Sequence, residues 1–167
     1  KNILLNDLIK NACDMFYQTE QKLKIINSAN INPLLFVDHY KMTLAIKNLI
    51  DNALKYSDPN KLVELSINGH EKSIEVCVKD FGAGITKEQI NKITKPLYRG
   101  RAAKEKNKTG FGLGLAITKK IVEAHNGQLK INSIINKLLN INNNIVEKCF
   151  LYKNQNIHDE HYLIKLN

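Results

Sequence analysis

The segment from Lys47 to Tyr56 constrains the fold of this chain most, because it places polar and apolar side chains on opposite sides of one helix. Asn48 and Asn52 are four residues apart and Lys55 and Tyr56 follow one turn later, so the four side chains share one helical face. Apolar residues occupy the opposite stripe at the period of a core-facing helix. They are Met42, Ile46, Leu49, Ile50, Ala53 and Leu54. The polar face favours a polar ligand, and the alternative is a surface helix with an asparagine-rich solvent side.

Composition indicates an ordinary globular domain. A chain of 167 residues with 43% hydrophobic content normally forms one domain with a real core. No apolar run approaches the roughly 18–20 residues that span a bilayer, and the N-terminus is unlike a signal peptide. The net charge of +9 invites a nucleic-acid interpretation, but the lysines are spread along the chain. The one local basic run is at residues 104–108, so we expect no nucleic-acid partner.

The cysteines provide a further constraint. Cys13, Cys77 and Cys149 are odd in number and scattered, with no Cys-x-x-Cys pair. This pattern argues against both a disulfide framework and a zinc site, and it favours a reducing cytosol.

Apolar periodicity and turn residues predict a mixture of helices and strands. The predicted helices cover residues 4–18, 39–56, 86–93 and 111–125, and the predicted strands cover 22–27, 34–38, 63–68, 73–80 and 128–133. Residues 95–109 have little apolar content and no period, which indicates a long loop or lid. Beyond Ser133, we expect strands at 148–152 and 162–166 that edge the sheet.

Asp80 is the last residue of the predicted strand at 73–80, and two glycines follow it. Gly82 and Gly84 let the backbone turn sharply and approach a ligand closely. The carboxylate of Asp80 can accept a hydrogen bond from the amine of adenine, but it repels the carbonyl of guanine. The alternative interpretation is a plain strand-to-turn connection.

A second glycine segment opens directly into the predicted helix at 111–125. Gly110, Gly112 and Gly114 alternate there, and a helix N-terminus presents unpaired N–H groups and a positive dipole end to an anion. This arrangement favours contact with phosphate, with close packing as the alternative. The spacing fails the Rossmann Gly-x-Gly-x-x-Gly pattern. The Asp-Phe-Gly at Asp80 is also not that of a eukaryotic protein kinase, because no His-Arg-Asp precedes it.

In order and spacing, these segments resemble the catalytic ATP-binding domain of sensor histidine kinases. Residues 48–56 are similar to the N box of that family, residues 80–84 to its first glycine box, and residues 110–115 to its second. The continuation at 116–127 resembles the helix that follows the second box, and the resemblance covers about residues 2–133.

The resemblance implies the Bergerat fold, an α/β (α+β) two-layer sandwich. Its sheet is mixed and mainly antiparallel, its helices lie on one face, and ATP is held between helices and lid. We therefore expect a catalytic domain over residues 1–133 with a lid at about 94–109. The tail at 134–167 is expected to add edge strands to the same domain.

The resemblance also implies roles for individual residues. Asn52 would be the Mg²⁺ ligand, because a single carboxamide oxygen suits an ion that takes its other ligands from water and phosphate. Lys55 would contact the phosphates, Tyr56 would pack near the adenine or ribose, and Asp80 would bind the adenine amine. The implied catalytic residues are Asn48, Lys55 and Arg99. The implied nucleotide-binding residues are Asn52, Lys55, Tyr56, Asp80, Gly82, Gly84, Ile85, Tyr98, Arg99, Arg101, Thr109, Gly110, Phe111, Gly112, Leu113, Gly114 and Leu115.

Asn48 separates a kinase from an ATPase within the resemblance. Related ATPases of this fold carry a Glu four residues before the metal-binding Asn, where it activates water as a general base. A carboxamide cannot accept a proton at neutral pH, so Asn48 leaves ATP available for phosphoryl transfer. A structural hydrogen bond by Asn48 is compatible with that role.

The chain departs from the family pattern at three places. Thr94 and Leu97 stand where the F box usually carries Phe, and the usual terminal Gly-Thr-x-Phe strand is missing after Ser133. There is also no phosphoacceptor box, because His70-Glu71 lies in a predicted hairpin turn. We expect surface or packing roles for the other histidines, which are His39, His125, His158 and His161.

The resemblance therefore implies the catalytic fragment of a larger kinase whose dimerisation helices and sensor precede Lys1. With Mg²⁺ and ATP, it would phosphorylate a histidine on those helices for relay to an aspartate of a response-regulator receiver domain. The full protein would be a homodimer, with this chain as the cytoplasmic domain of a bacterial inner-membrane sensor. The alternatives are an ATPase of the same fold and a non-catalytic nucleotide-sensing or docking module.

Overall fold

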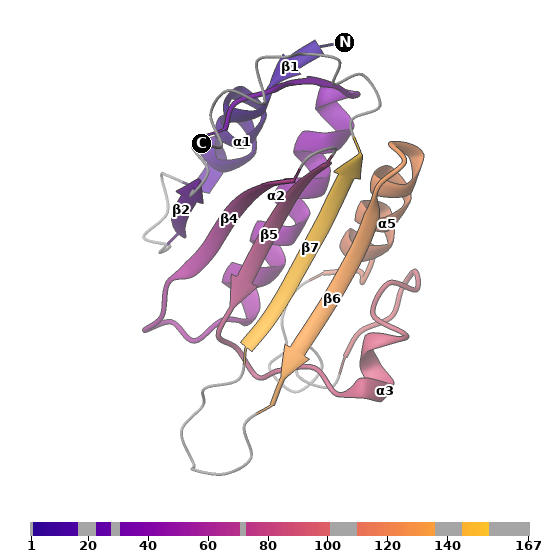
Figure 1. Ribbon diagram of the computed structural model, residues 1–167. Helices are drawn as coiled ribbons and strands as arrows, with labels where there is room; N and C mark the ends of the chain where they lie inside the picture. The colour runs from indigo at the N-terminus through magenta and orange to yellow at the C-terminus, as the bar shows by residue number, and fades with distance from the viewer. Residues whose placement is uncertain are drawn as a thin grey trace.

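The computed structural model describes residues 2–16, 23–27, 31–70, 73–100, 110–135 and 145–153. These residues form two layers, a five-stranded sheet and the helices that cover one of its faces (Figure 1). The strands are β2 (Leu23–Asn27), β4 (Val63–His70), β5 (Ser73–Asp80), β6 (Gln128–Ile134) and β7 (Ile145–Lys153), in the order β2-β4-β5-β7-β6. β2 is parallel to β4 and the other pairs are antiparallel, so the expected mixed, mainly antiparallel sheet is confirmed.

Helices α1, α2 and α5 lie together behind the sheet in Figure 1. The helical elements are α1 (Leu5–Cys13), the 3₁₀ turn η1 (Asp14–Phe16), α2 (His39–Tyr56), α3 (Lys87–Ile90) and α5 (Gly114–Ala124). A separate antiparallel ribbon pairs β1 (Asn2–Leu4) with β3 (Leu34–Phe36). Within the described residues, no helix is long and apolar enough to cross a membrane.

Helix α2 has the bounds that the sequence predicts. Its N-cap is Asp38, whose carboxylate accepts a hydrogen bond from the N–H of Lys41 at 3.1 Å. The predicted apolar stripe is confirmed, with Leu54 only partly buried and Ala45 as an additional member. The fully buried residues of α2 are Met42, Ala45, Ile46, Leu49, Ile50 and Ala53.

Strand β5 supplies the sheet side of the core. Its side chains alternate between partly buried and buried, which is the period-2 pattern of a strand with one face against the helices. Ile74, Val76 and Val78 occupy the buried positions, and Asp80 is the next position in the same row, at 2% exposure. The strand geometry therefore carries one carboxylate into the interior at the end of an apolar row.

Two helical predictions need adjusted bounds. The helix predicted at 86–93 is the single turn α3, and Thr86 is its N-cap in a capping box with Gln89. The helix predicted from residue 111 begins only at Gly114, because the two preceding glycines have positive φ angles that an α-helix does not accommodate.

The expectation that residues 148–152 edge the sheet is wrong. β7 pairs with β5 on one side and with β6 on the other, so it is an interior strand. It forms without the Gly-Thr-x-Phe motif because Phe150 and Tyr152 are buried in the core at alternating positions. The strand predicted at 162–166 lies outside the described residues.

The expectation that the cysteines form no disulfide is also wrong. Cys77 and Cys149 are direct partners in the register of β5 and β7, and a disulfide joins them. Their separation of 72 residues hid this proximity in the sequence. Cys13 is buried in α1 and is a free thiol.

Candidate functional site

A cleft of about 560 Å³ opens at the C-terminal ends of β5 and α2 and at the N-terminal end of α5. This volume is typical of a site for a small organic ligand. Most of the predicted site residues line it, and these are Asn48, Asn52, Lys55, Tyr56, Asp80, Gly84, Ile85, Tyr98, Arg99, Gly110, Phe111, Gly112, Leu113, Gly114 and Leu115. Gly82 does not line it, and Arg101 and Thr109 lie outside the described residues.

Asn48 and Asn52 project from α2 toward the start of α5. The Nδ2 atom of Asn48 donates to the carbonyl of Gly114 at 3.3 Å, and Nδ2 of Asn52 donates to the carbonyl of Asn48 at 3.0 Å. A Cβ atom at Gly114 would lie 3.6 Å from Nδ2 of Asn52, so the two helices meet closely here. Because each amide nitrogen donates to the backbone, each carboxamide oxygen is kept as the acceptor or metal-ligand atom.

Asp80 is held by two hydrogen bonds at the floor of the cleft. Its Oδ1 atom accepts from the N–H of Gly82 at 3.1 Å, and its Oδ2 atom accepts from Nζ of Lys148 at 2.9 Å. Lys148 lies opposite Val78 in the β5–β7 register, so it shares the inward face of the sheet with Asp80, one diagonal step away. The side chains of this ion pair are 2% and 4% exposed.

The turn after Asp80 is fixed to the end of α2. The N–H of Phe81 donates to the hydroxyl of Ser57, and the N–H of Asp58 donates to the carbonyl of Phe81, each at 3.2 Å. A Cβ atom at Gly82 would collide with the carbonyl of Tyr56. Gly82 therefore permits close packing between the turn and α2, and its predicted contact with nucleotide stays a prediction.

The second glycine segment contacts the start of the predicted lid. The N–H of Leu97 donates to the carbonyl of Gly112 at 3.0 Å. Gly112 has a φ of 71°, and a Cβ atom there would lie 2.5 Å from the carbonyl oxygen of Tyr98. Only glycine satisfies both conditions without strain. Leu97 itself adopts a φ of 64° and is exposed, at the place of the missing F-box Phe.

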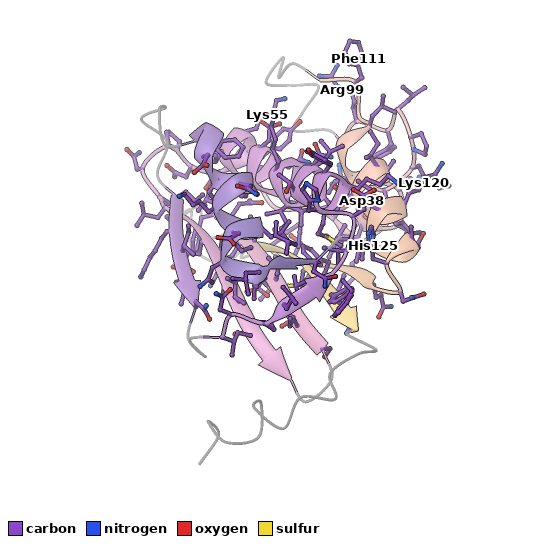
Figure 2. The ribbon with its side chains drawn as sticks, turned by 90° about the horizontal axis from the view of Figure 1, so that it is seen from above. Asp38, Lys55, Arg99, Phe111, Lys120 and His125 are labelled. Atoms are coloured by element: carbon purple, nitrogen blue, oxygen red, sulfur yellow. A yellow bond between two sulfur atoms is a disulfide. The ribbon has the colours of Figure 1, made fainter. Side chains whose placement is uncertain are left out.

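Cationic side chains gather at the same end of the cleft. Lys55 comes from the last turn of α2, and a Cβ atom at Gly110 would lie 3.3 Å from its Nζ atom. Figure 2 shows Lys55, Arg99 and Phe111 at one end of the molecule, away from Asp38 and His125. The lysine ammonium is thus next to the glycine segment, which is the arrangement that an anionic ligand requires.

Tyr56 has a perturbed environment in this cleft. Burial raises the pKa of its phenol above the ordinary value, the positive charge of Arg99 lowers it, and the negative charge of Asp51 raises it. The phenol is therefore neutral at physiological pH, and it forms a partly buried wall of the cleft.

The polar groups that line the cleft fit Mg²⁺ and a nucleoside triphosphate. Mg²⁺ prefers hard oxygen ligands, and most of its coordination positions are filled by phosphate and water. A single carboxamide oxygen from Asn52 therefore suits it. The described residues also bring Glu75, Cys77 and Cys149 together, but the two sulfurs are joined in the disulfide and are not thiolate ligands.

Several further residues line the cleft without having been predicted from the sequence. They are Asp51, Ala83, Thr86, Gln89, Ile93, Gly100, Ile117, Ile135 and Lys148. Most of them are sequence neighbours of predicted residues, so a wider window around each motif would have included them. Lys148 had no such signal, because it belongs to a strand without a recognisable motif.

Comparison with known proteins bears on these observations. A family model described as "Histidine kinase-, DNA gyrase B-, and HSP90-like ATPase" matches residues 37–146. That range contains α2, Asp80 and the glycine segment. The chain belongs to this ATPase family.

The sensor protein RprX of Bacteroides fragilis is 31% identical over 141 residues, which are 81% of this chain and 27% of RprX. The sensor protein kinase WalK of Staphylococcus haemolyticus is 42% identical over 135 residues, which are 80% of this chain and 22% of WalK.

Solved structures share the fold of this chain. A mycobacterial sensor histidine kinase, MprB, superposes with a TM-score of 0.76 at 18% identity, over 92% of this chain and 96% of that chain. Full-length ShkA in complex with AMPPNP superposes with a TM-score of 0.73 at 16% identity, over 91% of this chain and 30% of that chain. The Bergerat fold is thereby confirmed, and the chain is an ATPase-family catalytic domain of the sensor histidine kinase type. It spans about a quarter of the length of the curated relatives described above.

Proposed function

We propose that this chain binds Mg-ATP in the cleft and transfers the γ-phosphate to a histidine on dimerisation helices outside it. The observation that carries the proposal is the pair of asparagines on α2. Asn48 and Asn52 both line the cleft, and each directs its amide nitrogen to a backbone carbonyl. Their carboxamide oxygens are therefore available at the place where the family resemblance puts the metal and the phosphates.

Mg²⁺, when bound, would supply neutralisation of the phosphate charge. Asn52 would hold the ion through its carboxamide oxygen, and Asn48, which donates to the carbonyl of Gly114, keeps α2 against the start of α5. Asn48 cannot accept a proton, so it does not activate water for hydrolysis. This favours transfer over ATP hydrolysis.

The glycine segment and the cations hold the triphosphate. The N–H groups of Gly110 to Leu115 donate to phosphate oxygens, and Lys55, next to Gly110, adds a positive charge. Arg99 and Arg101 orient the γ-phosphate. The acceptor imidazole nitrogen attacks phosphorus in line, the bond to the β–γ bridging oxygen breaks, and ADP leaves.

The role of the whole protein follows from the same proposal. The phosphoryl group passes from the histidine to an aspartate of a response-regulator receiver domain. The full protein is a homodimeric bacterial sensor at the inner membrane, and this chain is its cytoplasmic catalytic domain. ShkA, which has the same fold, is in complex with AMPPNP, an analogue of ATP, and this supports the nucleotide part of the proposal.

One observation favours hydrolysis as a second candidate function. Asp51 lines the cleft and is a carboxylate that could act on water. It is adjacent to Asn52 on the helix and so points about 100° away from it, which argues against a shared water. Release of phosphate by the wild type, abolished in Asp51→Asn, would establish the ATPase instead.

Calorimetric titration with AMPPNP, with and without Mg²⁺, is the first test. We expect binding that requires the metal, followed by transfer of labelled phosphate from ATP to the dimerisation helices of the parent protein. Phosphohistidine is labile to acid and stable to base, which identifies the product. Metal-dependent binding without transfer would favour the docking module, and absence of binding in folded protein would reject the proposal.

A further inference from the structure

The ion pair between Asp80 and Lys148 gives the floor of the cleft a positive charge beside its negative one. The Lys148 Nζ atom lies 2.9 Å from Oδ2 of Asp80, both side chains are almost fully buried, and both residues line the cleft. Removing two charges from water is costly, and apolar residues of similar size often serve stability equally well. Because the atoms of this buried pair border a cleft, their position indicates a role in recognising the ligand.

Both partners keep hydrogen-bonding capacity for a ligand. Each carboxylate oxygen of Asp80 can accept two hydrogen bonds, and each is engaged by one donor, the N–H of Gly82 or the ammonium of Lys148. The ammonium has three N–H donors, and within the described residues Asp80 is its one hydrogen-bond partner. The floor thus offers an acceptor and a donor side by side.

This arrangement matches the edges of two kinds of purine. Adenine presents a donor at its 6-amine and an acceptor at N1, whereas hypoxanthine and guanine present an acceptor at O6 and a donor at N1–H. A carboxylate alone rejects the second pattern, because O6 would face another acceptor. With Lys148 present, O6 can accept from the ammonium while N1–H donates to Asp80.

We propose that Lys148 is a specificity-determining residue, and that the site accepts 6-oxopurine nucleoside triphosphates in addition to ATP. The proposal rests on the proposed nucleotide binding of this cleft. It also modifies the sequence-based expectation that Asp80 excludes guanine, because that expectation treats the carboxylate as the only polar group at the floor.

The test compares ATP with inosine triphosphate (ITP) by calorimetry on the wild-type chain in Mg²⁺. Hypoxanthine differs from adenine only at position 6 and in the N1 proton, so the comparison isolates the exchange of donor and acceptor at the edge of the base that faces Asp80 and Lys148. We expect ITP to bind within about 10-fold of ATP. Binding of ITP more than about 10-fold weaker than ATP would overturn the proposal.

A Lys148→Met variant tests the role of the ammonium directly. We expect the ratio of the ITP and ATP dissociation constants to rise at least about 10-fold, because without the ammonium O6 of ITP faces only the carboxylate acceptor, whereas the 6-amine of ATP still donates to Asp80. Lys130→Met is the matched control, because Lys130 is exposed on the neighbouring strand β6, and its ratio should equal that of the wild type. An unchanged ratio in folded Lys148→Met would overturn the proposal.

Two further measurements keep the outcomes separate. Lys148→Met leaves Asp80 buried without a counter-ion, so the variant can fail to fold. Lys148→Arg retains the charge and the donors. Its ratio of the ITP and ATP dissociation constants should stay within about 10-fold of the wild-type ratio, whereas a larger change would contradict the proposal. Failure of ATP itself to bind the wild type would reject the proposed function, while binding of ATP with rejection of ITP would reject only this inference.

Discussion

The Nε2 atom of His125 accepts a hydrogen bond from the backbone N–H of Asp38 at 3.0 Å. The Nδ1 atom lies 2.7 Å from the carbonyl oxygen of Ile121, and because Nε2 is the acceptor, Nδ1 is the donor in this second hydrogen bond. Asp38 caps the start of α2 and His125 ends α5, and Figure 2 shows the two residues beside each other. The helix of the asparagine pair and the helix of the glycine segment are thereby joined at the end away from the cleft. The expected packing role of His125 is confirmed.

Replacing His125 with Ala should lower the free energy of unfolding by about 1–3 kcal/mol, because both hydrogen bonds are lost and the N–H of Asp38 is left without its partner. Urea denaturation measures the change. Lys120→Ala is the control, because Lys120 is exposed on the same helix and appears near His125 in Figure 2. Equal stability of the two variants would show that the hydrogen bond contributes nothing.

Replacing Asn52 with Ala should weaken Mg²⁺-dependent binding of AMPPNP by at least about 10-fold, since a direct metal ligand is removed. Binding in the presence of a chelator should change little, which separates loss of the metal from loss of nucleotide contacts. Asn60→Ala, at an exposed position after α2, is the control and should bind like the wild type. An unaltered affinity in Asn52→Ala would remove Asn52 from the metal site.

Replacing Gly112 with Ala should destabilise the chain by about 1–3 kcal/mol, because the new Cβ meets the carbonyl of Tyr98 and the φ of 71° is unfavourable for alanine. Gly100→Ala is matched to it, since its Cβ would meet only Nε2 of Gln89, at an ordinary 3.6 Å. That variant should stay within about 0.5 kcal/mol of the wild type. Urea denaturation of both variants would contradict the geometry if the two losses were equal.

The buried thiol of Cys13 should make the chain less stable in alkaline solution. Burial, assisted by the charge of Asp14, raises the pKa of its thiol from the ordinary 9.0 to about 11. Above the ordinary value the unfolded thiol ionises while the folded one does not, so its contribution is complete below pH 9.0 and is lost progressively toward a pH of about 11. Urea denaturation across this window should show a steeper decline for the wild type than for Cys13→Ala. Parallel declines would contradict the assignment.

The Cys77–Cys149 disulfide predicts a large effect of reductant. It closes a loop with a sequence separation of 72 residues, for which the loss of unfolded-chain entropy corresponds to about 4 kcal/mol. Reduction should lower the stability of the wild type by about that amount and leave Cys77→Ala/Cys149→Ala unaffected. A thiol titration in denaturant without reductant should find only Cys13, and detection of all three thiols would show that the pair is not oxidised.

Local sequence patterns predict much of the fold and most of the described site. The period of the apolar stripe determines the faces of α2, and the turn residues at either end determine its bounds. The alternation in β5 likewise predicts that Ile74, Val76 and Val78 face the core. These features depend on neighbours within a few residues, so they can be read without knowing where the rest of the chain lies.

Lys148 and the disulfide could not be predicted in this way. The sequence by itself determined the helix faces, the capping residues and the order of the polar and glycine motifs, because short-range geometry decides them. Only the tertiary structure placed β7 between β5 and β6, and that single choice of strand order and register put Cys149 opposite Cys77 and Lys148 diagonal to Asp80. Pairing between strands so distant in sequence depends on how the whole sheet buries its apolar face, which no local pattern encodes.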